Sequence, residues 1–198
     1  NAAAEWTVSG NAMTVNKSAG NIQTKKSFGS YQLHIEWKIP QKITGEGQAR
    51  GNSGVFLAST GPGDDGYELQ VLDSYKNKTY VNGQAGSIYK QSPPLVNASR
   101  MPGEWQSYDV IWKAPVFNSD STLNSPAYVT VFHNGVLIQN NTELQGPTKY
   151  IGKAAYTNTG SSAQNVSERI VGTKGVIDSS ELRGARLPYV KFPRHPQL

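Results

Sequence analysis

Short apolar runs separated by turn residues recur from Trp6 to Asn140, and in most of them apolar and polar side chains alternate. Alternation is typical of strands that bury one face, whereas an amphipathic helix repeats its apolar residues every three or four positions. The segment Tyr31–Ile39 shows it clearly, with Leu33, Ile35 and Trp37 on one face. The pattern predicts an all-β chain folded as a two-sheet antiparallel sandwich or jelly roll.

Other segments have the same character, and one turn is especially clear. Strands are expected at Trp6–Val8, Ala12–Val15, Ile22–Thr24, Ser53–Leu57, Tyr67–Leu72, Ser87–Lys90, Trp105–Trp112, Tyr128–Phe132 and Val136–Gln139. His133-Asn134-Gly135 predicts a hairpin, because Asn and Gly tolerate the positive φ of a type I′ turn. The segment Asn118–Pro126 indicates a polar loop. After Gly146 we expect strands at Tyr150–Thr157 and near either Gly175–Ile177 or Tyr189–Phe192.

Length and charge limit the classes of function. The 198 residues suit a single domain, 1–198. The net charge of +5 is spread along the chain, which argues against a nucleic-acid partner. No apolar run approaches the roughly 20 residues of a membrane span, and the absence of cysteine excludes thiolate chemistry. The start at Asn1, followed by small residues, is typical of a processed end, so we expect a periplasmic or secreted protein.

The stretch Arg50–Tyr75 places polar side chains within two apolar runs that flank a Gly/Pro/Asp turn. In Tyr67–Leu72 the apolar Tyr67, Leu69 and Val71 share one strand face, and Glu68 and Gln70 share the other. A strand buried on both faces is not expected to place Glu and Gln two residues apart. The Glu68 face is therefore expected either to meet bulk water or to line a concave surface, and we interpret the hairpin as the floor of a binding cleft.

Five runs carry a resemblance to a known family: FGSYQLHIEWKIP, GEGQARGNSGVFL, YELQVLDSY, NGQAGSIYKQSPPLVNASRMPGEWQSYDVIWKAP and AYVTVFHNGVLIQNNTELQGPT. They resemble the 3-keto-disaccharide hydrolase family, in the family's order, over about Trp6 to Thr148. The resemblance implies a concanavalin-like sandwich that cleaves glycosides oxidised to a ketone at sugar carbon 3. Members usually end in segments resembling LQDHG and FRNIW; this chain has neither, and its only late histidine is His195.

The chemistry implied by this resemblance needs a base, an acid and donors for an enolate. The ketone acidifies the carbon 2 proton, and a carboxylate in a partly dry cleft has a raised pKa, so Glu68 suits the base. Arg50 suits the oxyanion role through its fork of donors, and Tyr89 and His133 are candidate acids. Candidate substrate-binding residues are Asn52, Gln70, Asp73, Tyr75 and Gln84. Tyr80 joins Tyr75 and Tyr89 as a candidate for stacking on a sugar.

Structural alternatives stay open for several of these residues. Arg50 is equally suited to pairing with Asp73 or Glu68, and Asp73 to an Asx turn. His133 adjoins a hairpin tip, a position that is more often exposed and inert than catalytic. No cofactor is expected, although Asp64-Asp65 leaves a divalent cation open.

Two functions from other classes also remain. The first is a non-catalytic carbohydrate-binding module, because folds of this kind host many functions. The second is a conventional laminarinase-type glycoside hydrolase, which needs paired carboxylates on one strand face. The strand that would supply them has Glu68 followed two residues later by Gln70, which cannot serve as the second carboxylate, so this function ranks third.

Overall fold

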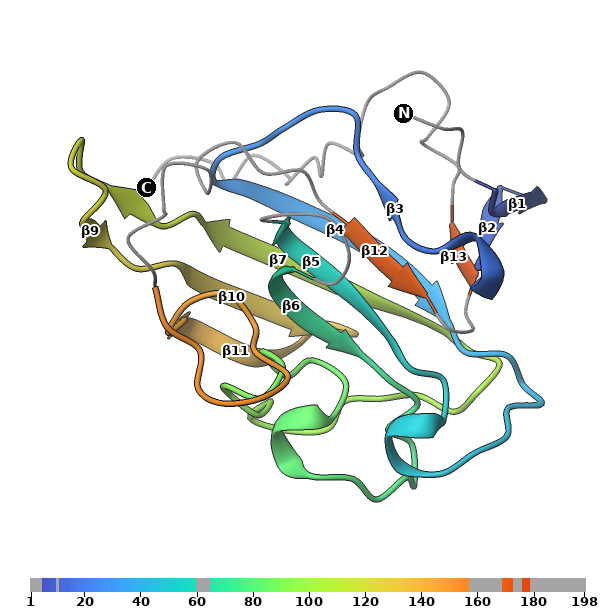
Figure 1. Ribbon diagram of the computed structural model, residues 1–198. Helices are drawn as coiled ribbons and strands as arrows, with labels where there is room; N and C mark the ends of the chain where they lie inside the picture. Colours follow the sequence, from blue (N-terminus) through green and yellow to red (C-terminus); the bar gives the residue numbers. More distant parts are fainter. Residues whose placement is uncertain (1–4, 10, 60–64, 157–168, 173–175, 179–198) are drawn as a thin grey trace, which may run out of the picture.

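The computed structural model describes residues 5–9, 11–59, 65–156, 169–172 and 176–178, and their regular structure consists of strands and short 3-10 helices (Figure 1). The strands are β1 Thr7–Ser9, β2 Ala12–Thr14, β3 Ile22–Gln23, β4 Tyr31–Lys38, β5 Ser53–Ser59, β6 Gly66–Val71, β7 Trp105–Lys113, β8 Val116–Phe117, β9 Leu123–Ser125, β10 Tyr128–His133, β11 Val136–Glu143, β12 Arg169–Gly172 and β13 Val176–Asp178. The 3-10 helices are η1 Lys17–Ala19, η2 Gly47–Ala49 and η3 Val81–Gly83. The all-β prediction is confirmed.

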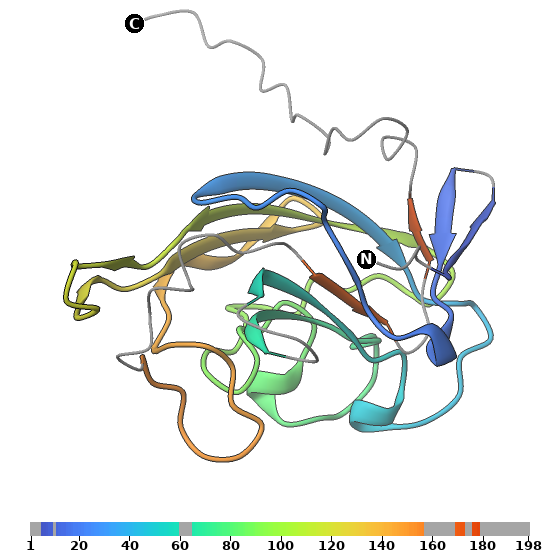
Figure 2. The same ribbon diagram turned by 45° about the horizontal axis from the view of Figure 1, so that its top comes forward.

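Two antiparallel sheets lie one over the other (Figure 2). The larger has the order β1-β2-β13-β4-β7-β10-β11, and the smaller has the order β3-β12-β5-β6. Their facing sides form the core, where the Tyr67 ring of β6 lies 5.3 Å from the Trp112 ring of β7. The Tyr108 hydroxyl also donates a hydrogen bond of 2.8 Å to the Gln70 carbonyl, so a β7 side chain holds the backbone of β6.

The expected alternation and hairpin are both present. On β4, the side chains of Leu33, Ile35 and Trp37 are buried in the core. Asn134 and Gly135 have φ angles of 53° and 80°, so the hairpin between β10 and β11 is confirmed.

Three sequence expectations differ from the structure. Residues 150–156 form no strand but an irregular segment, in which the Tyr156 hydroxyl bonds to backbone groups of Ala127 and Leu144. The expected loop at Asn118–Pro126 contains strand β9, which pairs with β8. The segment at Ser87–Lys90 forms isolated bridges rather than a strand.

The late strands come from the region where the pattern is weakest. β13 agrees with the expectation near Gly175–Ile177, and it lies inside the large sheet between β2 and β4. β12 joins the small sheet between β3 and β5. The alternative strand at Tyr189–Phe192 lies outside the described residues.

Residues 86–89 cover the edge of β6 that β5 leaves unpaired. Backbone bonds of 2.9–3.0 Å join Gln70 N to Ser87 O, Gly86 N to Gln70 O and Tyr89 N to Glu68 O. This pairing brings the loop that contains η3 alongside β6 (Figure 1). Within the described part of the chain, no helix has the length and apolar character needed to cross a bilayer.

Candidate active site

Glu68 lies on the face of β6 that points away from the core, where its side chain is nearly enclosed, at 6% exposure. The Tyr150 hydroxyl donates a hydrogen bond of 3.1 Å to its Oε2. Its backbone N–H donates to Thr148 Oγ1, also at 3.1 Å. Gly54 on β5 makes room for the carboxylate, because a Cβ there would lie 2.5 Å from Glu68 Oε1. The carboxylate is therefore packed against a glycine and held by a tyrosine.

Three tyrosines form a cluster that reaches Glu68. The rings of Tyr89 and Tyr150 lie 5.8 Å apart, and those of Tyr80 and Tyr89 lie 6.3 Å apart. The hydroxyls of Tyr80 and Tyr89 share a hydrogen bond. Burial raises the pKa of Tyr89, the bond to Tyr80 raises it further, and the nearby Glu68 charge adds to the effect. The Tyr89 hydroxyl thus keeps its proton at neutral pH.

Gln70 belongs to a network of side-chain amides on the same strand face as Glu68. Its Nε2 lies 3.2 Å from both Gln48 Oε1 and Asn52 Oδ1. The amide of Gln48 donates to Gly83 O at 2.7 Å, and that of Asn52 donates to Gln48 O at 2.9 Å. Both neighbours must therefore offer an oxygen to Gln70, which fixes the orientation of its amide. Gln70 Oε1 has no hydrogen-bond partner in the described structure.

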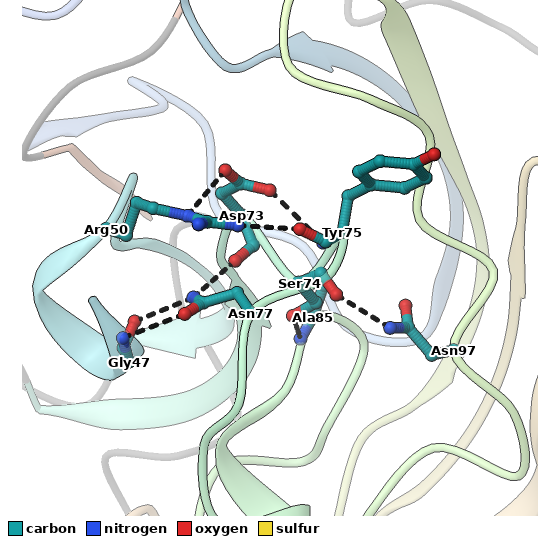
Figure 3. Close-up of polar contacts among 8 residues, drawn as sticks. All are labelled: Gly47, Arg50, Asp73, Ser74, Tyr75, Asn77, Ala85 and Asn97. Atoms are coloured by element: carbon teal, nitrogen blue, oxygen red, sulfur yellow. Dashed lines mark hydrogen bonds and ion pairs between the residues drawn. The ribbon is translucent and has the colours of Figure 1, made fainter. Parts of the chain in front are cut away.

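Arg50 and Asp73 form an ion pair at the far end of the hairpin (Figure 3). Arg50 Nε lies 2.8 Å from Asp73 Oδ2, and Nη2 donates to the Tyr75 carbonyl at 2.6 Å. Asp73 Oδ1 accepts a bond of 3.1 Å from Tyr75 N–H, and Asn77 Nδ2 donates to the Asp73 carbonyl at 2.6 Å. Of the alternatives that the sequence left open, pairing of Arg50 with Asp73 and an Asx turn at Asp73 are both present.

Arg50 is distant from Glu68 along the strand. Its carbonyl accepts a backbone bond from Asp73 N–H, so the two residues lie opposite each other. Asp73 follows Glu68 by five residues, which corresponds to about 16 Å of extended chain. Because its guanidinium is also held by Asp73 and Tyr75, Arg50 is placed to fix the loop rather than to stabilise an enolate beside Glu68.

His133 lies in the core between the sheets. Its ring stacks on Trp37 at 5.7 Å and contacts Tyr108 edge-on at 4.8 Å. Its Nε2 lies 2.9 Å from Gln106 Oε1. Burial lowers the pKa of His133 to about 4, with a further contribution from the charge of Arg100. The expectation of an exposed His133 is wrong, and a neutral ring packed in the core is not positioned as the acid for Glu68.

The Glu68 face of β6 also differs from expectation. Both faces of the strand are buried, and Gln70 is fully enclosed. The alternative in which the Glu68 face meets bulk water is therefore wrong. The expectation that a strand buried on both faces would not carry Glu and Gln two residues apart is also wrong. The amide network and the tyrosines make this possible, because they supply partners that a buried polar strand face needs. A cleft lined by Glu68, Gln70, Asn52 and Arg50 stays a prediction.

The remaining candidates lie in the loops around β6. Gln84 Nε2 donates to Val81 O at 3.2 Å within the η3 turn. The Tyr75 ring is half-buried, with Lys76 Nζ at 5.4 Å from its centre. Among the described residues, no three His, Asp or Glu side chains gather in a way that could hold a metal ion. Asp64 lies outside the described residues.

Comparison with known proteins gives the family. Residues 1–175 match the model of the 3-keto-alpha-glucoside-1,2-lyase-like domain. The chain belongs to this family. A crystal structure described as a "putative glycosyl hydrolase" from Parabacteroides distasonis is 45% identical, with a TM-score of 0.80, over 89% of this chain and 72% of its own. The family and this relative support a carbohydrate-processing enzyme.

Two further crystal structures from Parabacteroides distasonis, both described as putative glycosyl hydrolases, share the fold. The first is 17% identical with a TM-score of 0.61 and covers 89% of this chain and 88% of its own. The second is 18% identical with a TM-score of 0.54 and covers 87% of this chain and 79% of its own. No curated protein is significantly similar to the chain.

Sequence reasoning missed two residues of the candidate site. Tyr150 contacts Glu68 across 82 positions of sequence, from a segment that the sequence pattern assigned to a strand. Gln48 orients Gln70 across 22 positions, from the η2 turn. No local sequence signal indicates either contact.

Proposed function

We propose that this chain cleaves 3-keto-glycosides by elimination across sugar carbons 1 and 2, followed by hydration. The family match and the 45% identical relative support the substrate class. A base removes the proton on carbon 2, the C–H electrons form a carbon 1–carbon 2 double bond, and the bond from carbon 1 to the glycosidic oxygen breaks. That oxygen receives a proton and leaves as an alcohol. Water then adds across the double bond to give the free 3-keto sugar.

Glu68 is the proposed base. Its carboxylate has little contact with water, and the Tyr150 hydroxyl at 3.1 Å fixes Oε2. A positioned base of this kind contributes about 100- to 10,000-fold to a proton transfer. Tyr150 is a positioning residue in this scheme.

Tyr89 is the proposed acid. Burial and the bond to Tyr80 raise its pKa, so the hydroxyl is protonated at neutral pH. Its backbone N–H donates to the Glu68 carbonyl at 3.0 Å, and its ring lies 5.8 Å from that of Tyr150, whose hydroxyl is bonded to Glu68. A protonated acid beside the base is the arrangement that departure of the glycosidic oxygen needs. The observation that carries the proposal is this juxtaposition of a tyrosine-held carboxylate and a protonated tyrosine.

Arg50 and His133 are not catalytic groups in this proposal. Arg50 is committed to Asp73 and Tyr75, and His133 is packed among Trp37 and Tyr108. Asn52 and Gln70 remain the proposed contacts for sugar hydroxyls. Because Gln70 is fully enclosed, contact with its Oε1 requires neighbouring side chains to move when the sugar binds.

The test offers methyl 3-keto-α-glucopyranoside and unoxidised methyl α-glucopyranoside to the wild type and to Glu68→Gln. Turnover of the keto sugar alone is expected, with exchange of its carbon 2 proton, and a fall in kcat of about 100- to 10,000-fold in Glu68→Gln. Glu143→Gln is the matched control, because Glu143 also accepts a tyrosine hydroxyl, from Tyr128, but on an exposed surface.

The other outcomes identify the alternatives. Cleavage of the unoxidised sugar indicates a conventional glycoside hydrolase. Binding of either sugar without turnover indicates a carbohydrate-binding module. Undiminished activity of Glu68→Gln contradicts the assignment of the base.

A further inference from the structure

Two of the tyrosines near Glu68 are partly exposed, and their hydroxyls already have hydrogen-bond partners within the protein. Tyr80 and Tyr150 are each 43% exposed, in contrast to the buried Tyr67 and Tyr108. The Tyr80 hydroxyl bonds to that of Tyr89, and the Tyr150 hydroxyl bonds to Glu68. Each hydroxyl therefore already has a partner within the protein, and the surface that these residues offer without the loss of a hydrogen bond is that of their rings.

The residues next to these tyrosines in sequence are also apolar and exposed. Val81 follows Tyr80 and is 64% exposed, and Ile151 follows Tyr150 and is 94% exposed. A sugar unit bound here can stack one face on the tyrosine rings, but Val81 and Ile151 offer its hydroxyls no hydrogen-bond partner. An aromatic or aliphatic ring gains from the same contact.

The side chains of Tyr80 and Tyr150 are held in place before any ligand binds. Gly83 lies under the Tyr80 ring, where a Cβ would come within 2.2 Å of Cε2. The Gly83 carbonyl is fixed by Gln48. Lys90 Nζ donates to the Tyr150 carbonyl at 2.6 Å, which ties the Tyr150 segment to the residue after Tyr89. A fixed aromatic surface binds a ring without first losing conformational entropy.

We propose that Tyr80, Tyr89 and Tyr150, with Val81 and Ile151 beside them, form a subsite for an apolar ring in the leaving group of the glycoside. The proposal rests on the proposed function, since it places the leaving group next to the base and the acid. The preferred substrates are then 3-keto-glycosides of aromatic or other apolar ring-containing alcohols, rather than 3-keto-disaccharides.

The test compares benzyl and methyl 3-keto-α-glucopyranosides, because benzyl alcohol and methanol are nearly equal in acidity and differ in the ring. The wild type is expected to favour the benzyl compound in kcat/KM by roughly two- to tenfold, mostly through KM, as 0.5–1.5 kcal/mol of aromatic contact implies. Tyr80→Ala is expected to bring the ratio close to one. Ile151→Ser, at an exposed position, is expected to lower it if Tyr80→Ala does not fold.

Val8→Ser is the matched control. Val8 is an apolar residue of β1 with 64% exposure, and β1 lies far from the residue 144–156 segment in both views (Figures 1 and 2). Its benzyl-to-methyl ratio is expected to equal that of the wild type.

Calorimetric titration with the unoxidised benzyl and methyl α-glucopyranosides separates this proposal from the proposed function. If no keto sugar is turned over, the proposed function fails, and the titration alone decides the subsite. Tighter binding of the benzyl compound that Tyr80→Ala abolishes supports the subsite. Equal binding, no binding of either compound, or a kinetic ratio unchanged in Tyr80→Ala and Ile151→Ser overturns it.

Discussion

Gly54 of β5 and Glu68 of β6 lie so close that a methyl group on Gly54 would be 2.5 Å from Glu68 Oε1. In the β5–β6 ladder Gly54 is opposite Gln70, and Phe56 is opposite Glu68, so Gly54 is a diagonal neighbour of the carboxylate. A side chain at this position competes with the carboxylate for the same space. The position of Glu68 is therefore set by the neighbouring strand as well as by its own.

Gly54→Ala is expected to displace the Glu68 carboxylate and to lower kcat/KM on a 3-keto-glycoside by about tenfold or more, since small misplacements of a catalytic group are costly. Overpacking also lowers the free energy of unfolding, by about 1–3 kcal/mol. Kinetics and urea unfolding measure the two effects. Gly29→Ala is the control, because its Cβ meets nothing within 4 Å. Full activity of Gly54→Ala would show that the carboxylate position does not matter.

Tyr150→Phe removes the hydroxyl that holds Glu68 Oε2 at 3.1 Å. A fall in kcat of about tenfold with little change in KM is expected, because the group that holds the base is lost while the ring remains. Tyr128→Phe is the matched control, since its hydroxyl makes an equivalent 2.9 Å bond to Glu143 on the surface. Equal kcat values in the two variants would remove Tyr150 from the positioning role.

The sequence predicts features that depend on local alternation, and it does not predict contacts between distant segments. Tyr67, Leu69 and Val71 are assigned to the core correctly, because a strand turns alternate residues to opposite sides. Tyr150 cannot be placed in this way, since it comes from an irregular segment 82 positions away from Glu68. Residues 150–156 contain enough apolar side chains to resemble a strand, but those that turn inward, such as Tyr156, bond to backbone groups instead.

The burial of His133 also depends on contacts between distant segments. A polar residue next to an Asn-Gly turn is usually exposed, and only the packing of the Trp37 and Tyr108 rings around it makes it a core residue. The roles open to Arg50 are likewise distinguished by geometry, since the guanidinium is bonded to Asp73 and Tyr75 at the end of the hairpin. Charge and spacing alone suit either role.

The Arg50–Asp73 pair is expected to stabilise the loop, and a double-mutant cycle can measure it. Removing one partner leaves the other charge without its counterpart, and because Arg50 is partly exposed we expect each of Arg50→Met and Asp73→Asn to cost about 2–3 kcal/mol in the free energy of unfolding. The double variant is expected to cost less than the sum of the single variants. Urea unfolding of the four proteins provides the values, and additive effects would contradict the pairing.

The same variants distinguish a structural Arg50 from a catalytic one. If Arg50 only fixes the loop, the Arg50→Met variant is expected to keep kcat within about tenfold of the wild type at temperatures where the variant is folded. An enolate-stabilising role predicts a loss of about 100- to 1,000-fold, as for removal of one oxyanion donor. Kinetics on methyl 3-keto-α-glucopyranoside, with folding monitored by circular dichroism, measures this difference.

His133 is expected to make the fold sensitive to acid. Its pKa is lowered from 6.5 to about 4 by burial, so between these values the unfolded chain binds a proton that the folded chain does not. Stability is therefore lost as the pH falls from 6.5 toward 4, by up to about 3 kcal/mol from this group. His133→Gln is expected to be less stable at pH 7 but to lose this part of the pH dependence. His34→Gln, on the outer face of the large sheet beside Asp109, is the control and retains it. Urea unfolding at several pH values, and an NMR titration of the imidazole, test the prediction; a His133 midpoint near 6.5 would contradict it.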